Sequence, residues 1–486
     1  MKKAMQLTYA GDRNMYSGSR VAQAFSATAF GLLVGLSAQP ATAADTPDAQ
    51  VLKKLEALEK EMDALKAQLR ANTTAIANAP QKTGGGPEVS FGGQYRINSY
   101  SVDNDIPGQG DQSASRARIR QNVDIKFDEQ FKTHLQMELG HTTDNIDTTN
   151  NSTRGNNLAV RHAVMDYTTK SGINLQAGIV PLGDYFGDTL FSSDWNYNPV
   201  ALSAIAPVGV GKLRAFASSL KKKSETNTNT NDLAHYQLDY VLPLAGKNQI
   251  NFGGSFIRAG DPAAIQRNHS NLGLGGQAEV GSGLMVNAFI LASRTDKDLL
   301  AKGVGNGSGT AVKLELAGRA GPGKFGLLAT HASGKSDGTG FLPTQALART
   351  NGYWGYTGIL TIQGPTDTGF DGDSVNISNN GFGLSTVQAK YAFPITQDLS
   401  GYVAAGWFGN TKTPTGRSGD VGTDYLLMGN YRFNKFLALD FGAAVAKLKD
   451  GVSGYSNGVI GGTTFNQGAG VNRDKRALFT RLQAEF

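Results

Sequence analysis

The 486-residue chain contains no cysteine. This absence excludes a disulfide scaffold, thiolate metal sites and haem attached through Cys-x-x-Cys-His. Its six histidines are scattered without the spacing of metal ligands, and no Ser, His and Asp arrangement suggests a hydrolase. We therefore expect no metal, no cofactor and no enzymatic activity.

The chain also lacks an apolar run long enough for a transmembrane helix, for which about 20 residues are needed. Its main apolar stretch is Ala22–Ala38, which follows four basic residues and precedes a small-x-small sequence at Ala41–Ala43. We interpret residues 1–44 as a cleaved signal peptide. The alternative is a membrane anchor, which the short apolar run disfavours.

A strong positive charge is missing as well. The formal net charge is +6, and residues 1–44 carry four basic residues and one acidic residue. The mature chain would therefore carry only +3. Because the chain also has no RNA-binding or helix-turn-helix pattern, we expect no nucleic-acid partner.

One segment near the N-terminus has helical periodicity. Apolar residues with alternating spacings of four and three form the a/d seam of a short coiled coil: Val51, Leu55, Leu58, Met62, Leu65 and Leu69. Three heptads are short for an independent coil, so we expect residues 45–77 to be a periplasmic coiled-coil segment of a homotrimer. The alternative is a single amphipathic helix lying on the rest of the protein or on peptidoglycan. Residues 78–87 are rich in Gly and Pro and form a linker.

From residue 88 onward, apolar and polar residues alternate with the two-residue period of a β-strand. The expected strands include Val89–Ile97, Ile119–Phe127, Phe131–Leu139, Ile173–Val180, Pro199–Ala206, Leu213–Leu220, Leu233–Leu242, Ile250–Ile257, Leu272–Val280, Leu284–Ala292, Val312–Ala320, Phe325–His331, Phe382–Phe393, Tyr402–Phe408, Tyr425–Phe433, Leu437–Leu448 and Leu478–Phe486. The mean hydropathy of −0.28 is compatible with strands that have one polar face. This pattern predicts an all-β fold, a transmembrane antiparallel β-barrel spanning residues 88–486.

Short and long connections mostly alternate between these strands. Short ones include Asp128–Gln130, Lys170–Gly172, Gly281–Gly283, Gly321–Gly323 and Phe433–Lys435, whereas Thr142–Asn157 and Lys335–Gly381 are long and polar. Transmembrane barrels have this asymmetry. The strand number is eighteen if Pro199–Ala206 and Leu213–Leu220 are separate strands and Tyr353–Ile362 lies within a loop; otherwise it is sixteen. A barrel of this size encloses an aqueous channel.

A row of basic residues is the clearest candidate for channel chemistry. Arg116, Arg118, Arg120 and Lys126 share one strand face, opposite Ile119, Val123, Ile125 and Phe127. A Lys or Arg facing lipid costs about 2–4 kcal/mol at mid-bilayer, so the basic face should line the lumen. Arg96, Lys132 and Arg481 have the same parity on other strands. We expect these seven residues to attract anions; equally, acidic residues elsewhere could neutralise them and leave weak selectivity.

A second candidate segment follows the strand that ends near Pro181. It contains Gly178, Pro181, Gly183 and the pair Ser192 and Ser193. This arrangement resembles that of the phosphate-selective porins O and P, in which a loop folded into the barrel follows. The resemblance implies a diffusion porin with Asp184, Tyr185, Asp188 and Asp194 on a constriction loop. We expect these aspartates to face the Arg row.

The last expected strand ends on Phe486, and its apolar face matches the parity of Val89–Ile97. We expect these strands to pair and close the barrel. Phe486 also resembles the assembly signal of bacterial outer-membrane barrels. The sequence therefore predicts an outer-membrane porin that admits small hydrophilic solutes and favours anions, with the barrel-assembly machinery, membrane lipid and lipopolysaccharide as partners. The alternatives are a non-conducting scaffold barrel, such as a cytochrome sheath or adhesin, and a barrel enzyme.

Overall fold

The computed structural model describes residues 86–105, 111–139, 158–195, 197–221, 232–260, 267–281, 283–296, 306–344, 355–367, 375–413, 416, 418–451 and 473–486. The expected signal peptide, the coiled-coil segment and most of the linker lie outside these ranges. No helix among the described residues is both long and apolar enough to cross a bilayer.

The described ranges hold eighteen strands and three short 3-10 helices. The strands are β1 (Glu88–Asn104), β2 (Gln112–Lys126), β3 (Phe131–Leu139), β4 (Leu158–Thr168), β5 (Asn174–Ile179), β6 (Val200–Val208), β7 (Gly211–Lys221), β8 (Asp232–Pro243), β9 (Gln249–Gly260), β10 (Arg267–Val280), β11 (Leu284–Thr295), β12 (Gly307–Ala320), β13 (Gly323–Ala332), β14 (Leu384–Pro394), β15 (Leu399–Asn410), β16 (Asp420–Arg432), β17 (Leu437–Leu448) and β19 (Arg473–Glu485). The 3-10 helices are η1 (Ser193–Trp195), η3 (Gly364–Thr366) and η4 (Asn379–Gly381).

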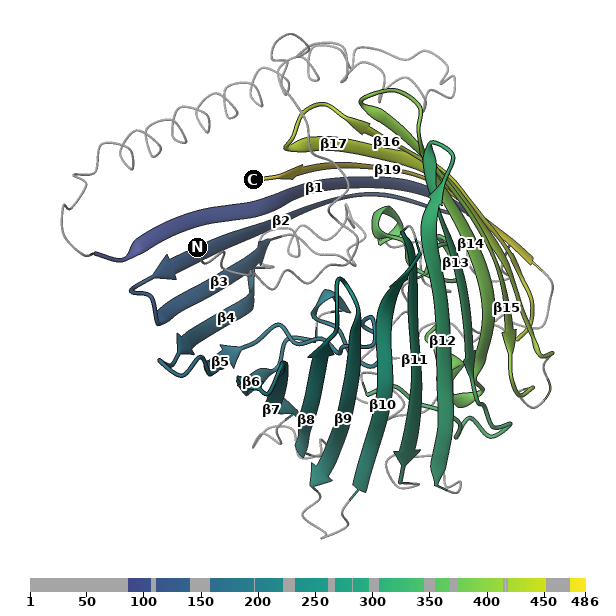
Figure 1. Ribbon diagram of the computed structural model, residues 1–486. Coiled ribbons are helices and arrows are strands. Elements are labelled where there is room, and N and C mark those ends of the chain that lie inside the picture. Colours follow the sequence, from purple (N-terminus) through teal and green to yellow (C-terminus); the bar gives the residue numbers. More distant parts are fainter. Residues whose placement is uncertain are drawn as a thin grey trace, which may run out of the picture. The chain divides into compact units, whose positions relative to one another are not determined.

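The strands form one closed antiparallel barrel. Each strand pairs with its neighbours along the chain, and β1 pairs with both β2 and β19. Ile97 lies opposite Leu482, and Phe486 exchanges two backbone hydrogen bonds with Gly93 at the seam. Figure 1 shows β1 and β19 side by side at this closure. The expected pairing of the last strand with the first is confirmed.

Eighteen strands result because both conditions for the larger number are met. The strands β6 and β7 are separate and joined by a tight turn at Gly209, whose φ of 58° is left-handed. The described residues 355–362 lie in the connection between β13 and β14 and add no strand to the sheet. The barrel class and its expected size are therefore correct.

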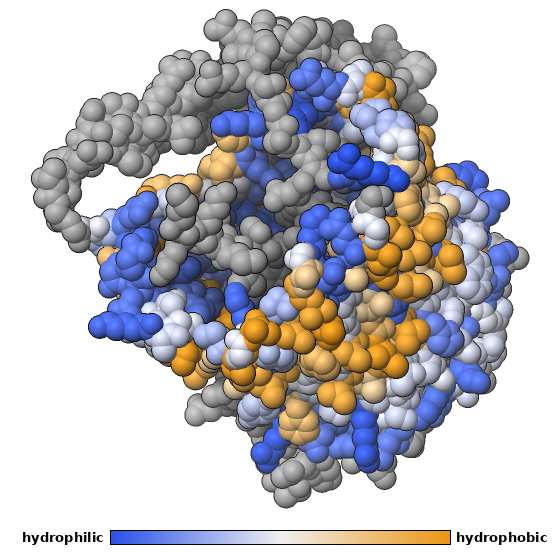
Figure 2. Space-filling view, in the orientation of Figure 1, coloured by the Kyte–Doolittle hydropathy of each residue, from blue (hydrophilic) through white to orange (hydrophobic). Residues whose placement is uncertain are grey.

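The two faces of the barrel differ as a membrane requires. Large apolar side chains are exposed on the outer face, and Figure 2 shows hydrophobic residues gathered over the middle of the strand wall, with hydrophilic residues along its lower edge. Exposed aromatic residues lie near the short turns (Phe127, Tyr167, Tyr431, Phe433, Phe436, Phe486) and near the long connections (Tyr236, Phe256, Trp407, Tyr425). Two such belts are typical of barrels that span a bilayer.

Two long connections fold against the inner face of the wall. The β5–β6 loop (residues 180–199) buries Phe186 and Phe191 against the strands, and the described part of the β13–β14 loop buries Phe341 and Ile359. These residues form a hydrophobic cluster with inward side chains such as Phe289. The loops therefore occupy space inside the barrel and narrow its lumen.

Candidate functional site

The basic row lies on the inner face of β2. Arg116 and Arg118 are buried there, whereas the alternating neighbour Ala117 is exposed on the outer face. Across the β1–β2 pairing, Arg118 lies opposite Arg96, and Arg120 lies opposite Gln94. Three guanidinium groups thus occupy neighbouring positions on two strands.

The hydrogen-bond partners of these arginines determine how much of their positive charge is neutralised. Arg118 donates a 2.6 Å hydrogen bond to the neutral amide oxygen of Gln94. Arg116 donates to the Tyr100 hydroxyl at 2.9 Å and lies 5.2 Å from the centre of that ring. Both of these contacts are to uncharged groups, so neither of them cancels a positive charge.

Other basic residues of the predicted row have acidic partners that sequence reasoning did not find. Arg120 lies 2.6 Å from Glu138 on β3, and Arg481 lies 2.7 Å from Asp440 on β17. At the short-turn end, ion pairs join Lys126 to Glu129 (2.5 Å) and Lys132 to Asp166 (4.0 Å), and Arg96 lies 3.4 Å from Asp367. The neutralisation considered as an alternative therefore applies to part of the row.

A β-bulge on β4 adds a further basic side chain to the inner wall. Gln136 pairs with His162, while Met137 pairs with Val160, so Arg161 is an extra residue without a partner position. As a result, consecutive residues Arg161 and His162 are both buried on the inner side. Arg161 extends the basic wall and donates a hydrogen bond to the Ser193 carbonyl oxygen of the β5–β6 loop at 2.5 Å.

The β5–β6 loop is held in shape by the carboxylate of Asp184. This group accepts hydrogen bonds from the backbone N–H groups of Phe186 (2.6 Å), Leu190 (2.5 Å) and Phe191 (3.1 Å). Burial raises the pKa of Asp184 to about 6, against the opposing effect of these three donors. The Asp184 carboxylate is turned into its own loop, so the expectation that it faces the Arg row is wrong.

Aromatic residues fix the same loop to the wall. The ring of Tyr185 lies 4.2 Å from the guanidinium carbon of Arg214, whose charge is paired with Asp239 at 2.5 Å. Phe186 sits over glycines of β9 and β10: a Cβ at Gly273 would lie 2.4 Å from its ring. Because glycine has no side chain, these strand positions leave space in which the Phe186 ring of the loop packs against the backbone.

The two remaining aspartates of the loop, Asp188 and Asp194, lie in different surroundings. Asp194 is exposed beside Ser193, which accepts the Arg161 bond, so it lies next to the basic wall. Asp188 is half-buried, with Lys313 of β12 among the charges acting on it, and burial together with Asp184 and Asp194 raises its pKa. Asp194 therefore lies near Arg161, which is not part of the predicted row, and its expected position facing that row stays a prediction.

The β13–β14 loop places Tyr356 among charged residues of the strands, a contact that the sequence did not reveal. Glu315 of β12 accepts a 2.5 Å hydrogen bond from the Tyr356 hydroxyl and pairs with Lys313 at 3.1 Å. The Lys390 ammonium lies 4.2 Å from the centre of the Tyr356 ring. The same loop supplies Asp367 to Arg96, so it contacts the wall at widely separated strands.

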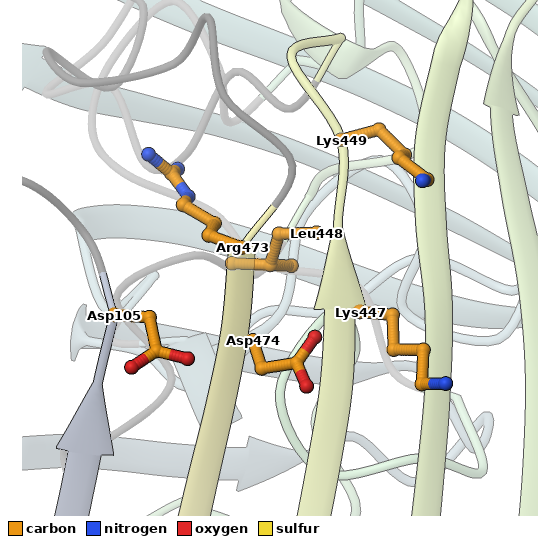
Figure 3. A pocket seen from close by; sticks show the side chains of 6 residues that line it. All are labelled: Asp105, Lys447, Leu448, Lys449, Arg473 and Asp474. Atoms are coloured by element: carbon orange, nitrogen blue, oxygen red, sulfur yellow. The ribbon is translucent and has the colours of Figure 1, made fainter.

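A cavity of about 270 Å³ lies at the rim, where β1, β17 and β19 meet their long connections. Figure 3 shows Asp105 and Asp474 on neighbouring strand ends, with the side chains of Lys447 and Arg473 directed apart. Because both charge signs line this cavity, it offers no field of one sign. The lumen wall is therefore the stronger candidate site.

Three solved structures are similar to this chain to different degrees. OccAB4 of Acinetobacter baumannii has a TM-score of 0.50 and 11% identity, covering 84% of this chain and all of that one. The outer membrane protein opdK of Pseudomonas aeruginosa has a TM-score of 0.49 and 12% identity, covering 82% of this chain and 99% of that one. An anion-selective porin of Comamonas acidovorans has a TM-score of 0.42 and 10% identity, covering 82% of this chain and all of that one.

The likeness to OccAB4 supports the barrel fold. At such low identity, it concerns the fold alone. No protein-family model matches the chain, and no curated protein matches its sequence. The function must therefore be argued from the lumen itself.

Proposed function

We propose that this protein is an outer-membrane porin whose barrel forms a water-filled channel for the passive diffusion of small hydrophilic solutes. The observation that carries this proposal is a closed barrel with an apolar, aromatic-belted outer face and charged side chains on its inner face. Eighteen strands enclose a lumen wide enough for water, and the two inward loops reduce its width.

The channel prefers anions because its least neutralised wall is basic. Arg118 donates to the neutral Gln94 amide, whereas its neighbours Arg96, Arg120 and Arg161 each lie within 4.0 Å of a carboxylate, so Arg118 carries most of this preference. The planar fork of N–H donors on a guanidinium group matches the geometry of both carboxylate and phosphate anions. Phosphate selectivity, suggested by the resemblance to porins O and P, remains the narrower form of this proposal.

The remaining partners follow from a location in the outer membrane. Phe486 would be read by the barrel-assembly machinery, lipopolysaccharide would surround the outer rim, and the segment 45–77 would hold a homotrimer together. In the closed barrel, Phe486 lies at the seam beside Tyr95, with ring centres 5.3 Å apart. Removal of residues 45–77 should then lower the mass of the purified oligomer in light scattering.

Proteoliposome swelling tests the proposed function. Vesicles containing the folded protein should swell in isosmotic monosaccharide and much more slowly in a tetrasaccharide, because the inward loops limit size. Vesicles prepared with the heat-unfolded protein provide the baseline. If folded protein gave only this baseline rate for every solute, the proposal would be wrong and a scaffold barrel would fit better.

A further inference from the structure

Two histidines and an aspartate form a line across the inner face of three neighbouring strands. On β2, Asp124 Oδ1 lies 2.7 Å from His134 Nδ1 on β3. The other ring nitrogen, His134 Nε2, lies 3.4 Å from His162 Nδ1 on β4. His162 has the same inward parity as Val164 and Asp166, and it pairs with Gln136, two residues from His134 on β3.

The separation of the two ring nitrogens matches that of metal ligands. Hydrogen bonds from N–H groups usually span about 2.7–3.2 Å, so 3.4 Å is long for one between imidazoles. Zinc binds histidine nitrogen at about 2.0–2.1 Å with tetrahedral angles, which places two nitrogen ligands about 3.4 Å apart. The rings lie with centres 5.6 Å apart and planes inclined by 37°.

The carboxylate of Asp124 prepares His134 for this role. A carboxylate that accepts a hydrogen bond from one ring nitrogen leaves the other nitrogen with a free lone pair and fixes the ring orientation. Here the nitrogen left free is Nε2, which faces His162. This arrangement is the usual support of a metal-binding histidine.

The surrounding charges allow a cation despite the nearby basic wall. Arg120 is paired with Glu138, and Arg161 also lies 4.0 Å from that carboxylate. Asp124 is about half exposed, and its negative charge next to His134 supports the site. The His134 side chain is 31% exposed, which leaves room for water ligands.

We propose that His134 and His162 bind one divalent transition-metal ion of the zinc or copper type on the inner wall of the barrel. Imidazole ligands favour these ions over magnesium and calcium, which prefer oxygen. No group of three or more His, Asp or Glu residues is arranged for a metal among the described residues, so solvent completes the coordination. Binding adds positive charge beside Arg161.

Titration of the purified full-length protein with Cu²⁺, followed by electron paramagnetic resonance, tests the site. The wild type should bind one Cu²⁺ with the spectral signature of two nitrogen ligands. His134→Ala and His162→Ala should each lose that two-nitrogen signal. Asp124→Asn should weaken binding by about 10- to 100-fold, as expected for a residue that orients a ligand.

His331 provides the matched control, because it lies on the exposed side of β13 and is bonded to Ser385 at 2.8 Å. His331→Ala should leave the signal unchanged. A wild-type signal with one nitrogen or none, or a signal that survives in the His134→Ala, His162→Ala double variant, would overturn the site. Because the readout is taken in detergent without any conductance, it is independent of the channel function.

Discussion

Neutralising Arg118 should reduce the anion preference of the channel, whereas neutralising Arg120 together with its partner Glu138 should leave it nearly unchanged. Both side chains lie on the inner face of β2. The guanidinium of Arg118 donates to the neutral Gln94 amide, whereas Arg120 is paired with Glu138 at 2.6 Å. Loss of Arg118 removes a full unit of positive charge, while loss of the Arg120–Glu138 pair leaves the net charge of the wall unchanged.

The size of the effect follows from Coulomb's law. A unit charge about 5 Å from a permeating ion contributes about 0.8 kcal/mol in a water-filled lumen. In 0.1 M salt, where the Debye length is about 10 Å, screening reduces this to roughly 0.5 kcal/mol. Because the anion loses this energy and the cation gains it, Arg118→Gln should lower the anion-to-cation permeability ratio roughly fivefold.

Reversal potentials in a tenfold salt gradient across a planar bilayer measure this ratio. Arg118→Gln should shift the potential toward that of a cation channel, and Glu138→Gln should shift it the opposite way by releasing the charge of Arg120. The double variant Arg120→Gln, Glu138→Gln should stay near wild type. Arg476→Gln is the matched control, since Arg476 pairs with Asp103 on the exposed outer side. Equal shifts for Arg118→Gln and Arg476→Gln would refute the reasoning.

Three further predictions concern the loops and the seam. Gly273→Leu should displace Phe186, because even a Cβ would lie 2.4 Å from its ring, and should raise the single-channel conductance; Gly254→Ala, where the nearest atom to an added Cβ lies 3.8 Å away, is the control. The carboxyl of Asp184 should titrate near pH 6, as measured by isotope-edited infrared spectroscopy. Its pKa in the folded protein exceeds the ordinary value of 3.8. Its contribution to the stability of the fold is therefore most favourable below pH 3.8 and falls as the pH rises to 6. The wild type should therefore lose more thermal stability than Asp184→Asn between pH 4 and 7, and parallel curves would contradict this. Phe486→Ala should lower stability by about 0.5–1.5 kcal/mol beyond the lost burial, because it removes the stack on Tyr95, and the temperature at which the folded band disappears on gels would measure it.

The sequence was most informative where one physical rule acts alone. Alternation of apolar and polar residues located most strands, because a lipid-facing side chain must be apolar at every second position. The closing pair β1–β19 followed from matching parity, whereas the turn positions left sixteen and eighteen strands both open. The strand β4 was not identified as a run, because the extra residue Arg161 interrupts its alternation.

The site was harder to predict, because it depends on contacts between distant residues. The partners Glu138 and Asp440 follow from strand register, which sequence parity narrows to a face but not to a residue. The inward path of the β13–β14 loop depends on Asp424, which accepts the backbone N–H groups of Ile359 (2.8 Å) and Leu360 (2.7 Å). Such local capping leaves no periodic pattern in the chain.

Single-channel conductance of the purified protein in a planar bilayer tests the central claim most directly. A water-filled lumen narrowed by two inward loops predicts discrete conductance steps in 1 M potassium chloride that larger cations and anions reduce. The temperature-unfolded protein should give none. Folded protein that inserts into the bilayer without any conductance steps would contradict an open channel and favour a closed scaffold barrel.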